Sequence, residues 1–271
     1  MTQVSIGEKH DEKEIKKILH PLVSEWFFGK FKEFSLTQQY GVLEIWNRND
    51  ILISAPTGGT KTLTAFLSVL NFLVGLAEQN KLEDKIYAIY TSPLKALSND
   101  IHKNLVEPLQ EITELAEKKG IKLQQIRVGL RTGDTTQSER AKMARKAPHI
   151  FVTTPESLAI VLTSKNFVEK MKAVEFCVVD EIHALDNKRG VYLSLTLERL
   201  NNISKIWPTK IGLSATVEPM EEVARYLVGE AKNRSVKYIR VPLSKTIDVD
   251  LLTPVEDLIE DKNITPSFYN L

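Results

Sequence analysis

Short apolar runs alternate along the chain with longer stretches in which apolar residues recur at helical spacing. The runs are rich in β-branched residues, which is typical of buried strands, and lie at residues 50–54, 86–92, 125–130, 149–153, 174–180 and 210–214. The helical stretches include residues 62–76, 96–115, 139–146, 191–203 and 220–227. Strands that alternate with helices predict an α/β fold, a doubly wound parallel sheet covered by helices on both faces.

The two ends of the chain depart from this alternation. Residues 12–32 predict one or two short helices with an aromatic cluster at Trp26, Phe27 and Phe28. After about residue 230 the sequence has strand-like pieces, prolines and acidic residues, but no further strand–helix repeat. We therefore divide the chain into an N-terminal helical extension (1–30), a core domain (31–230) and a connector (231–271).

Composition says more about the cellular compartment of the protein than about its function. Lysine and arginine total 36 against 35 acidic residues, so affinity for a polyanion would have to come from local patches. The single cysteine, Cys177, lies in an apolar run and has no second thiol in the chain, which fits a buried structural thiol in a reducing compartment. The N-terminus is charged, unlike a signal peptide, and no run approaches the length of a membrane span. We expect a cytoplasmic protein with no membrane partner.

A phosphate-binding loop is predicted at APTGGTKT, which follows a strand and opens a helix. In such a loop Lys61 would place its ammonium against the β- and γ-phosphates of a nucleotide, and the Thr62 hydroxyl would ligate Mg²⁺. The remaining nucleotide-binding positions of the loop are Thr57, Gly58, Gly59 and Thr60. The alternative interpretation is an ordinary strand-to-helix turn with a capping threonine.

An acidic pair, Asp180 and Glu181, ends another strand. Six of the seven residues from 173 to 179 are apolar, so this strand is expected to be buried and to present the two carboxylates at its carboxyl end. In that setting Asp180 would hold Mg²⁺ and Glu181 would polarise an attacking water. An isolated Asp-Glu pair is more often solvated surface.

Hydroxyls and prolines stand at two more strand-to-helix junctions, TSPLKAL (residues 91–97) and TTPESL (residues 153–158). Free backbone amides at such helix starts, together with hydroxyls, suit the phosphates of a nucleic-acid strand without reading its bases. As isolated strings these segments are more often helix caps.

Three further segments could serve a nucleotide. The ring of Phe31 can stack on a purine, and the Gln38 amide can both donate and accept at an adenine edge. Ser214 and Thr216 follow the last predicted strand of the core domain, where short hydroxyls could relay the state of the nucleotide through hydrogen bonds.

In this order, Phe31 with Gln38, APTGGTKT, TSPLKAL, RTGDT, TTPES, DEIH and SAT resemble the Q motif and motifs I, Ia, an intervening glycine motif, Ib, II and III of superfamily 2 helicases. The match covers residues 31–229, and seven strings in one order are far more specific than any one of them. The sequence also resembles the large helicase-related (Lhr) group, with the Ski2-like helicases as near neighbours, in the segments DEIHALDNKRG, LERL and KIGLSATVEPMEEVARYLVG.

The resemblance implies a RecA-like P-loop NTPase domain that binds ATP and Mg²⁺ and is the first of two such domains in a 3′ to 5′ helicase. Its partner would be a single-stranded or partly duplex nucleic acid, with DNA favoured over RNA. Adenine recognition would fall to Phe31 and Gln38, catalysis to Lys61, Asp180 and Glu181, and the metal to Thr62 and Asp180. Coupling of hydrolysis to movement would involve His183, Ser214 and Thr216, and the strand would lie against Pro93, Lys95, Arg131, Thr154 and Pro155.

The phosphate loop departs from the family pattern at Gly59 and Thr60, because the family has glycine immediately before the lysine. A β-branched residue at that position is expected to be strained if its φ must be positive, and to crowd the nucleotide. We therefore expect weakened ATP binding or turnover, which comparison with Thr60→Gly would test. The alternatives are a tolerated variant in which Gly59 supplies the bend, or an altered sequence.

No second RecA-like domain follows within the 271 residues. The arginines that such a domain extends to the γ-phosphate are therefore missing, and hydrolysis by this chain alone should be slow. Two other functions stay open. One is a nucleic-acid-binding or regulatory module with impaired ATP turnover, and the other is a P-loop enzyme unrelated to nucleic acid, such as a small-molecule kinase or a transporter ATPase.

Overall fold

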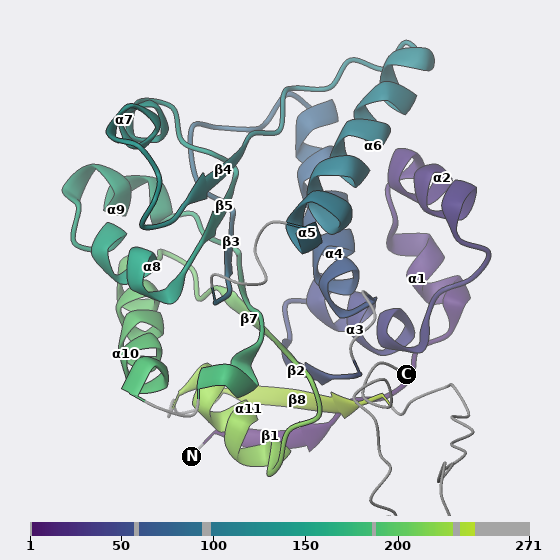
Figure 1. Ribbon diagram of the computed structural model, residues 1–271. Coiled ribbons are helices and arrows are strands. Elements are labelled where there is room, and N and C mark those ends of the chain that lie inside the picture. Colours follow the sequence, from purple (N-terminus) through teal and green to yellow (C-terminus); the bar gives the residue numbers. More distant parts are fainter. Residues whose placement is uncertain (1, 57–59, 94–98, 186–187, 230–233, 242–271) are drawn as a thin grey trace, which may run out of the picture.

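All eight strands of the described chain lie in one parallel sheet, with the order β1-β8-β2-β7-β6-β3-β5-β4 (Figure 1). The computed structural model describes residues 2–56, 60–93, 99–185, 188–229 and 234–241. The strands are β1 (Gln3–Ile6), β2 (Asp50–Ser54), β3 (Ala88–Thr91), β4 (Val128–Arg131), β5 (Ile150–Thr153), β6 (Phe176–Val179), β7 (Thr209–Ser214) and β8 (Ser235–Arg240). The six strands predicted from the apolar runs are all present, although five have shifted ends.

Helices cover both faces of the sheet (Figure 1). One face carries α1 (Glu12–Ile18), α2 (Pro21–Lys30), α3 (Leu36–Trp46), α4 (Thr60–Glu78), α5 (Asn99–Ile101), the π-helix η2 (His102–Val106) and α6 (Glu107–Lys118). The other carries α7 (Gln137–Arg145), α8 (Pro155–Val161), α9 (Lys165–Met171), the 3₁₀ helix η3 (Ile182–Leu185), α10 (Lys188–Ile203) and α11 (Met220–Val228). The doubly wound α/β fold is therefore confirmed.

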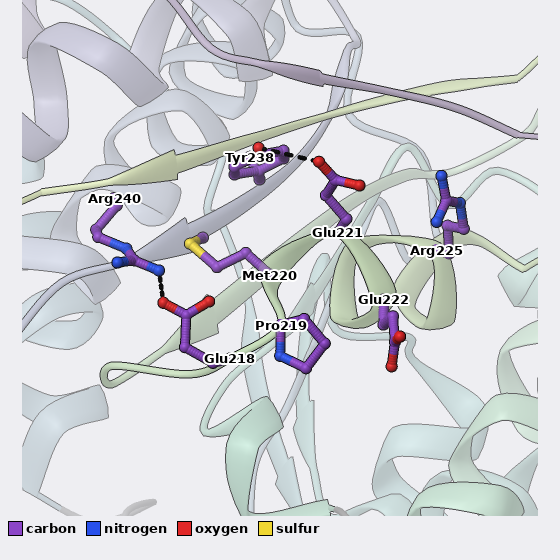
Figure 2. Close-up of a pocket in the computed structure, with 8 residues that line it drawn as sticks. All are labelled: Glu218, Pro219, Met220, Glu221, Glu222, Arg225, Tyr238 and Arg240. Carbon is purple, nitrogen blue, oxygen red and sulfur yellow. Dashed lines mark hydrogen bonds and ion pairs between the residues drawn. The ribbon is translucent and has the colours of Figure 1, made fainter.

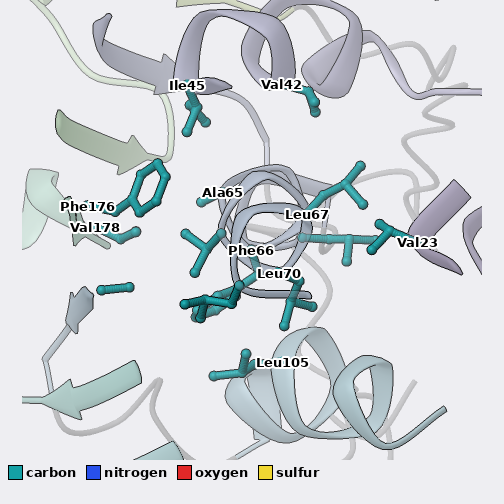
Figure 3. Packing of buried hydrophobic residues seen from close by; sticks show 14 of the residues in the cluster. Val23, Val42, Ile45, Ala65, Phe66, Leu67, Leu70, Leu105, Phe176 and Val178 are labelled. Carbon is teal, nitrogen blue, oxygen red and sulfur yellow. The ribbon is translucent and has the colours of Figure 1, made fainter. Parts of the chain in front are cut away.

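Two hydrophobic cores lie on opposite faces of the sheet because successive strand residues point to opposite sides. Phe176 and Val178 of β6 belong to one core, whereas Cys177 and Val179 of the same strand belong to the other. Figure 3 shows the first core around α4, whose side chains lie between the sheet and the neighbouring helices. Burial raises the pKa of the Cys177 thiol to about 12, so this cysteine is a packing residue, as expected.

Helix α4 corrects the expectation that no segment has the length of a membrane span. An 18-residue stretch of this 19-residue helix has a mean hydropathy of 1.4, so the helix is long and apolar enough to cross a membrane by those two measures alone. In the folded chain, however, 78% of that stretch is buried. Its apolar character is therefore explained by its position at the centre of one core.

The predicted helix over residues 96–115 is divided. Residues 94–98 lie outside the described part of the chain, and the rest forms α5, η2 and α6. The backbone N–H of Glu107 bonds to the carbonyl of His102, five residues back. Pro108 follows and has no N–H to donate to the carbonyl four residues earlier, so the wider π turn occurs where the regular pattern must break.

Two strands lie in segments that were assigned to the flanks. β1 comes from the N-terminal extension and pairs in parallel with β8, which comes from the expected connector. β8 in turn pairs with β2 of the core domain. Both flanks therefore contribute to the sheet of the core domain, in addition to the expected helices α1 and α2.

Candidate active site

The carboxyl ends of β2, β7 and β6 lie side by side, because these strands are neighbours in a parallel sheet. Ser54 of β2 is in register with Ser214 of β7, and Val179 of β6 is in register with Gly212. The segments that follow these strands therefore meet at one edge, where ligands bind in open α/β sheets. This edge brings together Lys61, Thr62, Asp180, Glu181, His183 and Ser214.

The Lys61 side chain turns back toward the two residues that follow β2. Its Nζ donates to the carbonyl oxygens of Ala55 at 2.6 Å and Pro56 at 3.1 Å. Burial lowers the pKa of Lys61, while the negative charges of Asp180 and Glu181 act in the opposite direction. A cation held this close to two carboxylates is placed to neutralise an anionic ligand at the start of α4.

Asp180 is buried, and three donors hold its carboxylate. The Tyr90 hydroxyl donates to Oδ2 at 2.5 Å, Thr62 donates to the same oxygen at 3.3 Å, and the Glu181 backbone N–H donates to Oδ1 at 2.8 Å. Burial raises the pKa of Asp180, and the bond from Tyr90 opposes that rise. A carboxylate beside a hydroxyl is a hard oxygen pair, which fits Mg²⁺ bound with water and phosphate oxygens completing its shell.

Glu181 and His183 connect the acidic pair to β7. The His183 Nε2 lies 3.1 Å from Glu181 Oε2, while its Nδ1 accepts from the Ala215 backbone N–H at 3.2 Å and lies 3.3 Å from Ser214 Oγ. Because Nδ1 is the acceptor, the ring proton is on Nε2 and points to Glu181. Glu181 has a φ of 53°, a sparsely populated conformation for a residue with a side chain. Thr216, the third predicted coupling residue, is exposed.

The two residues predicted to recognise adenine lie at the end of α2 and in the first turn of α3. Phe31 ends α2, is 38% exposed, and packs with its ring centroid 4.9 Å from that of Phe27. Gln38 is buried, and its Oε1 accepts from the Ser35 backbone N–H at 2.8 Å in a capping box that begins α3. The Gln38 side chain thus has a structural bond in addition to any bond with a base.

The described residues predicted to bind a nucleic-acid strand lie at or just after the carboxyl ends of β3, β4 and β5. Thr154 is the N-cap of α8, where its hydroxyl accepts from the Ser157 N–H, and Pro155 stands in the first turn. Arg131 ends β4 with its guanidinium 5.1 Å from the Phe167 ring centroid, and burial, together with the charge of Arg140, lowers its pKa. Pro93 is partly buried after β3. The helix-cap interpretation is therefore confirmed at α8, where the Thr154 hydroxyl accepts from the N–H of Ser157 and Pro155 has no N–H to donate.

Four predicted residues, Thr57, Gly58, Gly59 and Lys95, lie outside the described residues. Thr60 is described and corrects the strain argument. It is the first residue of α4 and is absent from the residues with positive φ, which are Arg48, Asn80 and Glu181 among the described non-glycine residues. A β-branched side chain is compatible with that helical backbone.

Tyr90 was missed by sequence reasoning although its hydroxyl is a close donor to Asp180. It lies in the middle of β3, ninety residues before Asp180, and reaches the site because β3 pairs with β6. The only signal in the sequence is a tyrosine hydroxyl within an otherwise apolar strand, which needs a partner when buried.

A separate pocket lies beside the segment that follows β7 (Figure 2). Its volume is about 300 Å³, and it is lined by Glu218, Pro219, Met220, Glu221, Glu222, Arg225, Tyr238 and Arg240. Glu218 pairs with Arg240 across it, and the Tyr238 hydroxyl donates to Glu221 at 3.4 Å. It contains none of the predicted site residues, so we place the nucleotide site at the Lys61–Asp180 edge and not here.

Comparison with known proteins identifies relatives of the chain. The chain is 47% identical over 268 residues to the ATP-dependent helicase Lhr-Core of Methanocaldococcus jannaschii, and 51% identical over 249 residues to that of Methanothermobacter thermautotrophicus. These alignments cover 98% and 91% of this chain but 31% and 29% of the relatives. The chain therefore spans less than a third of the length of these relatives.

A solved structure of Mycobacterium smegmatis helicase Lhr bound to ssDNA and AMP-PNP matches with a TM-score of 0.78 and 39% identity. The match covers 90% of this chain and 30% of that one. The sequence model of the DEAD/DEAH box helicase family matches residues 35–224, which include Gln38, the described part of the phosphate loop, the acidic pair and Ser214. The chain therefore belongs to the DEAD/DEAH box helicase family and is similar to the ATP-dependent helicases Lhr-Core of M. jannaschii and M. thermautotrophicus.

Proposed function

We propose that this chain is the first motor domain of a longer helicase, and that it binds Mg-ATP at the edge formed by Lys61, Thr62 and Asp180. The observation that carries the proposal is a continuous hydrogen-bonded path at this edge. It runs from Thr62 through Asp180 and Glu181 to His183 and the backbone that follows β7. Such a path connects the place where phosphate would bind to a segment outside the phosphate loop.

Each side chain has a role in the proposed hydrolysis. Lys61 would exchange its two carbonyl acceptors for phosphate oxygens, because an anion is a stronger partner for an ammonium. Thr62 and Asp180 would hold Mg²⁺, which supplies charge neutralisation for the transferred phosphoryl group. Glu181 would orient and accept a proton from the attacking water, with His183 holding its carboxylate in place.

The proposed partner is a single strand of nucleic acid, with DNA favoured over RNA, along which the whole protein moves 3′ to 5′. Support comes from the M. smegmatis structure, which is bound to ssDNA and AMP-PNP. On this chain the strand would cross the starts of the helices after β3 and β5, where Thr154 and Pro155 begin α8. Hydroxyls at these junctions suit phosphates and read no bases.

We further propose that the chain works with a second RecA-like domain and acts in the cytoplasm. Because such a domain supplies arginines to the γ-phosphate, this chain alone should bind Mg-ATP and turn it over slowly. The relatives are more than three times as long as the segment they share with this chain, which leaves room for a second domain.

The test is nucleotide binding and turnover by the parent chain, Lys61→Ala and Glu181→Gln. We expect Lys61→Ala to lose Mg-ATP binding, because the phosphates would lose the Lys61 ammonium and face two buried or half-buried carboxylates. Glu181→Gln should bind Mg-ATP like the parent and release phosphate at least about a hundredfold more slowly. The exposed Glu222→Gln in α11 is the matched control.

Failure would take one of two forms. A parent chain that binds no Mg-ATP would favour the nucleic-acid-binding module over a motor. A chain extended by its second domain whose ATPase is insensitive to matched DNA and RNA strands would favour a P-loop enzyme unrelated to nucleic acid.

A further inference from the structure

Thr60, the residue that departs from the family pattern, has a specific partner. Its Oγ1 lies 3.0 Å from Oγ1 of Thr37, and its backbone carbonyl accepts from the Thr64 hydroxyl at 2.6 Å. Thr60 is partly buried, and Thr37 is buried at 2% exposure. The side chain expected to crowd a nucleotide is thus turned toward α3 in this structure.

Thr37 stands beside the residue predicted to recognise adenine. It is the second residue of α3, and Gln38 follows it in the first turn, where the Gln38 amide closes the capping box with Ser35. The hydroxyl pair therefore joins the first turn of α3 to the residue that immediately precedes Lys61. Adenine would be recognised from α3 and phosphate from the start of α4.

The distance between these two helices has little freedom. One turn after Thr37, a side chain added at Gly41 would meet Thr64 Cγ2 at 2.8 Å and Ile53 Cδ1 at 2.9 Å. The backbone of α3 at Gly41 thus lies directly against the Thr64 side chain of α4 and the Ile53 side chain of β2. Because this junction is closely packed, the two helices have little room to shift, and the Thr37–Thr60 bond can hold the start of α4 at one position.

We propose that Thr37 and Thr60 act as a positioning pair that sets the separation between the adenine-recognition turn of α3 and the phosphate-binding start of α4. The inference rests on the proposed function, because it concerns how the same site binds ATP. A ligand that contacts both turns gains affinity when their separation is preset, since less ordering is required on binding. A ligand that contacts the phosphate-binding turn alone gains nothing.

The experiment compares Mg-ATP with Mg-tripolyphosphate on the full 271-residue chain. Thr37→Val and Thr60→Val remove one hydroxyl each and keep the branched shape. We expect each to weaken Mg-ATP binding by about three- to tenfold, the range for one net hydrogen bond. The double variant should lose no more than either single variant, because both changes break the same bond. Thr60→Ser should bind like the parent, and tripolyphosphate affinity should not change in any variant.

Two controls separate this role from a general loss of fold. Thr196→Val removes a buried helical hydroxyl in α10 that bonds to the Tyr192 carbonyl at 2.8 Å, away from the site. It should leave both affinities unchanged. Thermal unfolding of each variant identifies any that do not fold, and Thr37→Ala or Thr60→Ala, with the same expected loss, then replaces it. Thr60→Ser keeps the hydroxyl and removes only the methyl group, so it shows which of the two groups causes the loss.

Several results would overturn the inference. Thr60→Gly binding Mg-ATP more tightly than the parent would show that the side chain crowds the nucleotide. Additive losses in the double variant, or equal losses for ATP and tripolyphosphate, would show that the two hydroxyls do not act as a pair between the two turns. A parent that binds no Mg-ATP would overturn the proposed function together with this inference, whereas normal ATP binding by all the variants would overturn the inference alone.

Discussion

At the scale of single residues, the buried carboxylate of Asp180 depends on a tyrosine from another strand. Tyr90 donates to Asp180 Oδ2 at 2.5 Å, and burial with the charge of Asp180 raises the pKa of the tyrosine, so that it stays a donor. The bond fixes the direction of the carboxylate that would hold the metal. A residue that bonds to a metal ligand, as Tyr90 does here, orients that ligand and tunes its basicity.

Tyr90→Phe is expected to raise the Mg²⁺ concentration needed for half-maximal ATP binding by about tenfold or more. The buried Asp180 would lose the donor that opposes the rise in its pKa, so the carboxylate would be harder to keep ionised and less well oriented. Tyr87→Phe is the matched control, since Tyr87 lies just before β3 and its hydroxyl accepts from the Glu83 N–H at 3.0 Å rather than bonding to Asp180. Similar Mg²⁺ requirements in the two variants would contradict the assignment.

At the scale of elements, the approach of α3 to α4 decides whether the adenine and phosphate turns can act together. The contact is made at Gly41, where an added Cβ would come within 3 Å of Thr64 and Ile53 side chains. A glycine in the middle of a helix costs stability relative to alanine, so its presence here is explained by the close approach.

Gly41→Ala should lower the free energy of unfolding by about 1–3 kcal/mol, because the new methyl group overpacks the junction. Denaturant unfolding measures the change. Gly29→Ala in α2 is the control, since nothing lies within 4 Å of a Cβ there. That variant should be as stable as the parent or slightly more stable, and a Gly41→Ala chain of equal stability would mean that the helices can separate at little cost.

At the scale of the whole molecule, the two flanks are tied to the sheet at the ends of the strands opposite the nucleotide edge. Asp50, which begins β2, accepts from the Lys210 backbone N–H at 2.7 Å and from Arg234 Nη2 at 2.8 Å. Arg234 precedes β8 and also donates to the Pro208 carbonyl. β1 then pairs with β8 at the edge of the sheet, so both ends of the described chain depend on this junction.

Arg234→Met should destabilise the chain by about 3–5 kcal/mol, because it leaves a buried carboxylate without its cation. The side chains of Arg234 and Asp50 are 12% and 5% exposed, whereas the Arg240–Glu218 pair at the other end of β8 is 54% and 58% exposed. Arg240→Met should therefore cost less than about 1 kcal/mol. The denaturant midpoints of unfolding of the two variants measure this difference in stability. Equal midpoints would show that the Asp50 junction does not hold β8.

The alternation of apolar runs with amphipathic stretches was enough to predict the doubly wound sheet and the strand ends that carry the site. This is possible because period and apolar content are local properties, and in a parallel sheet the carboxyl ends of neighbouring strands meet at one edge. Lys61, Thr62, Asp180, Glu181 and Ser214 were each predicted just after a strand, and the resemblance added His183. That they meet depends on β2, β7 and β6 being neighbours in the sheet.

Other features were decided only by the tertiary structure. β1 is mostly exposed, and β8 lies beyond the strand–helix alternation, so only their pairing with each other and with β2 identifies them as strands of this sheet. The Tyr90–Asp180 bond depends on the register of β3 against β6, and the Thr37–Thr60 bond depends on the close packing of α3 on α4. The backbone of Thr60 is the clearest case. A threonine where the family has glycine predicted strain if its φ had to be positive, whereas its place in the first turn of α4 provides a helical conformation that a threonine can adopt.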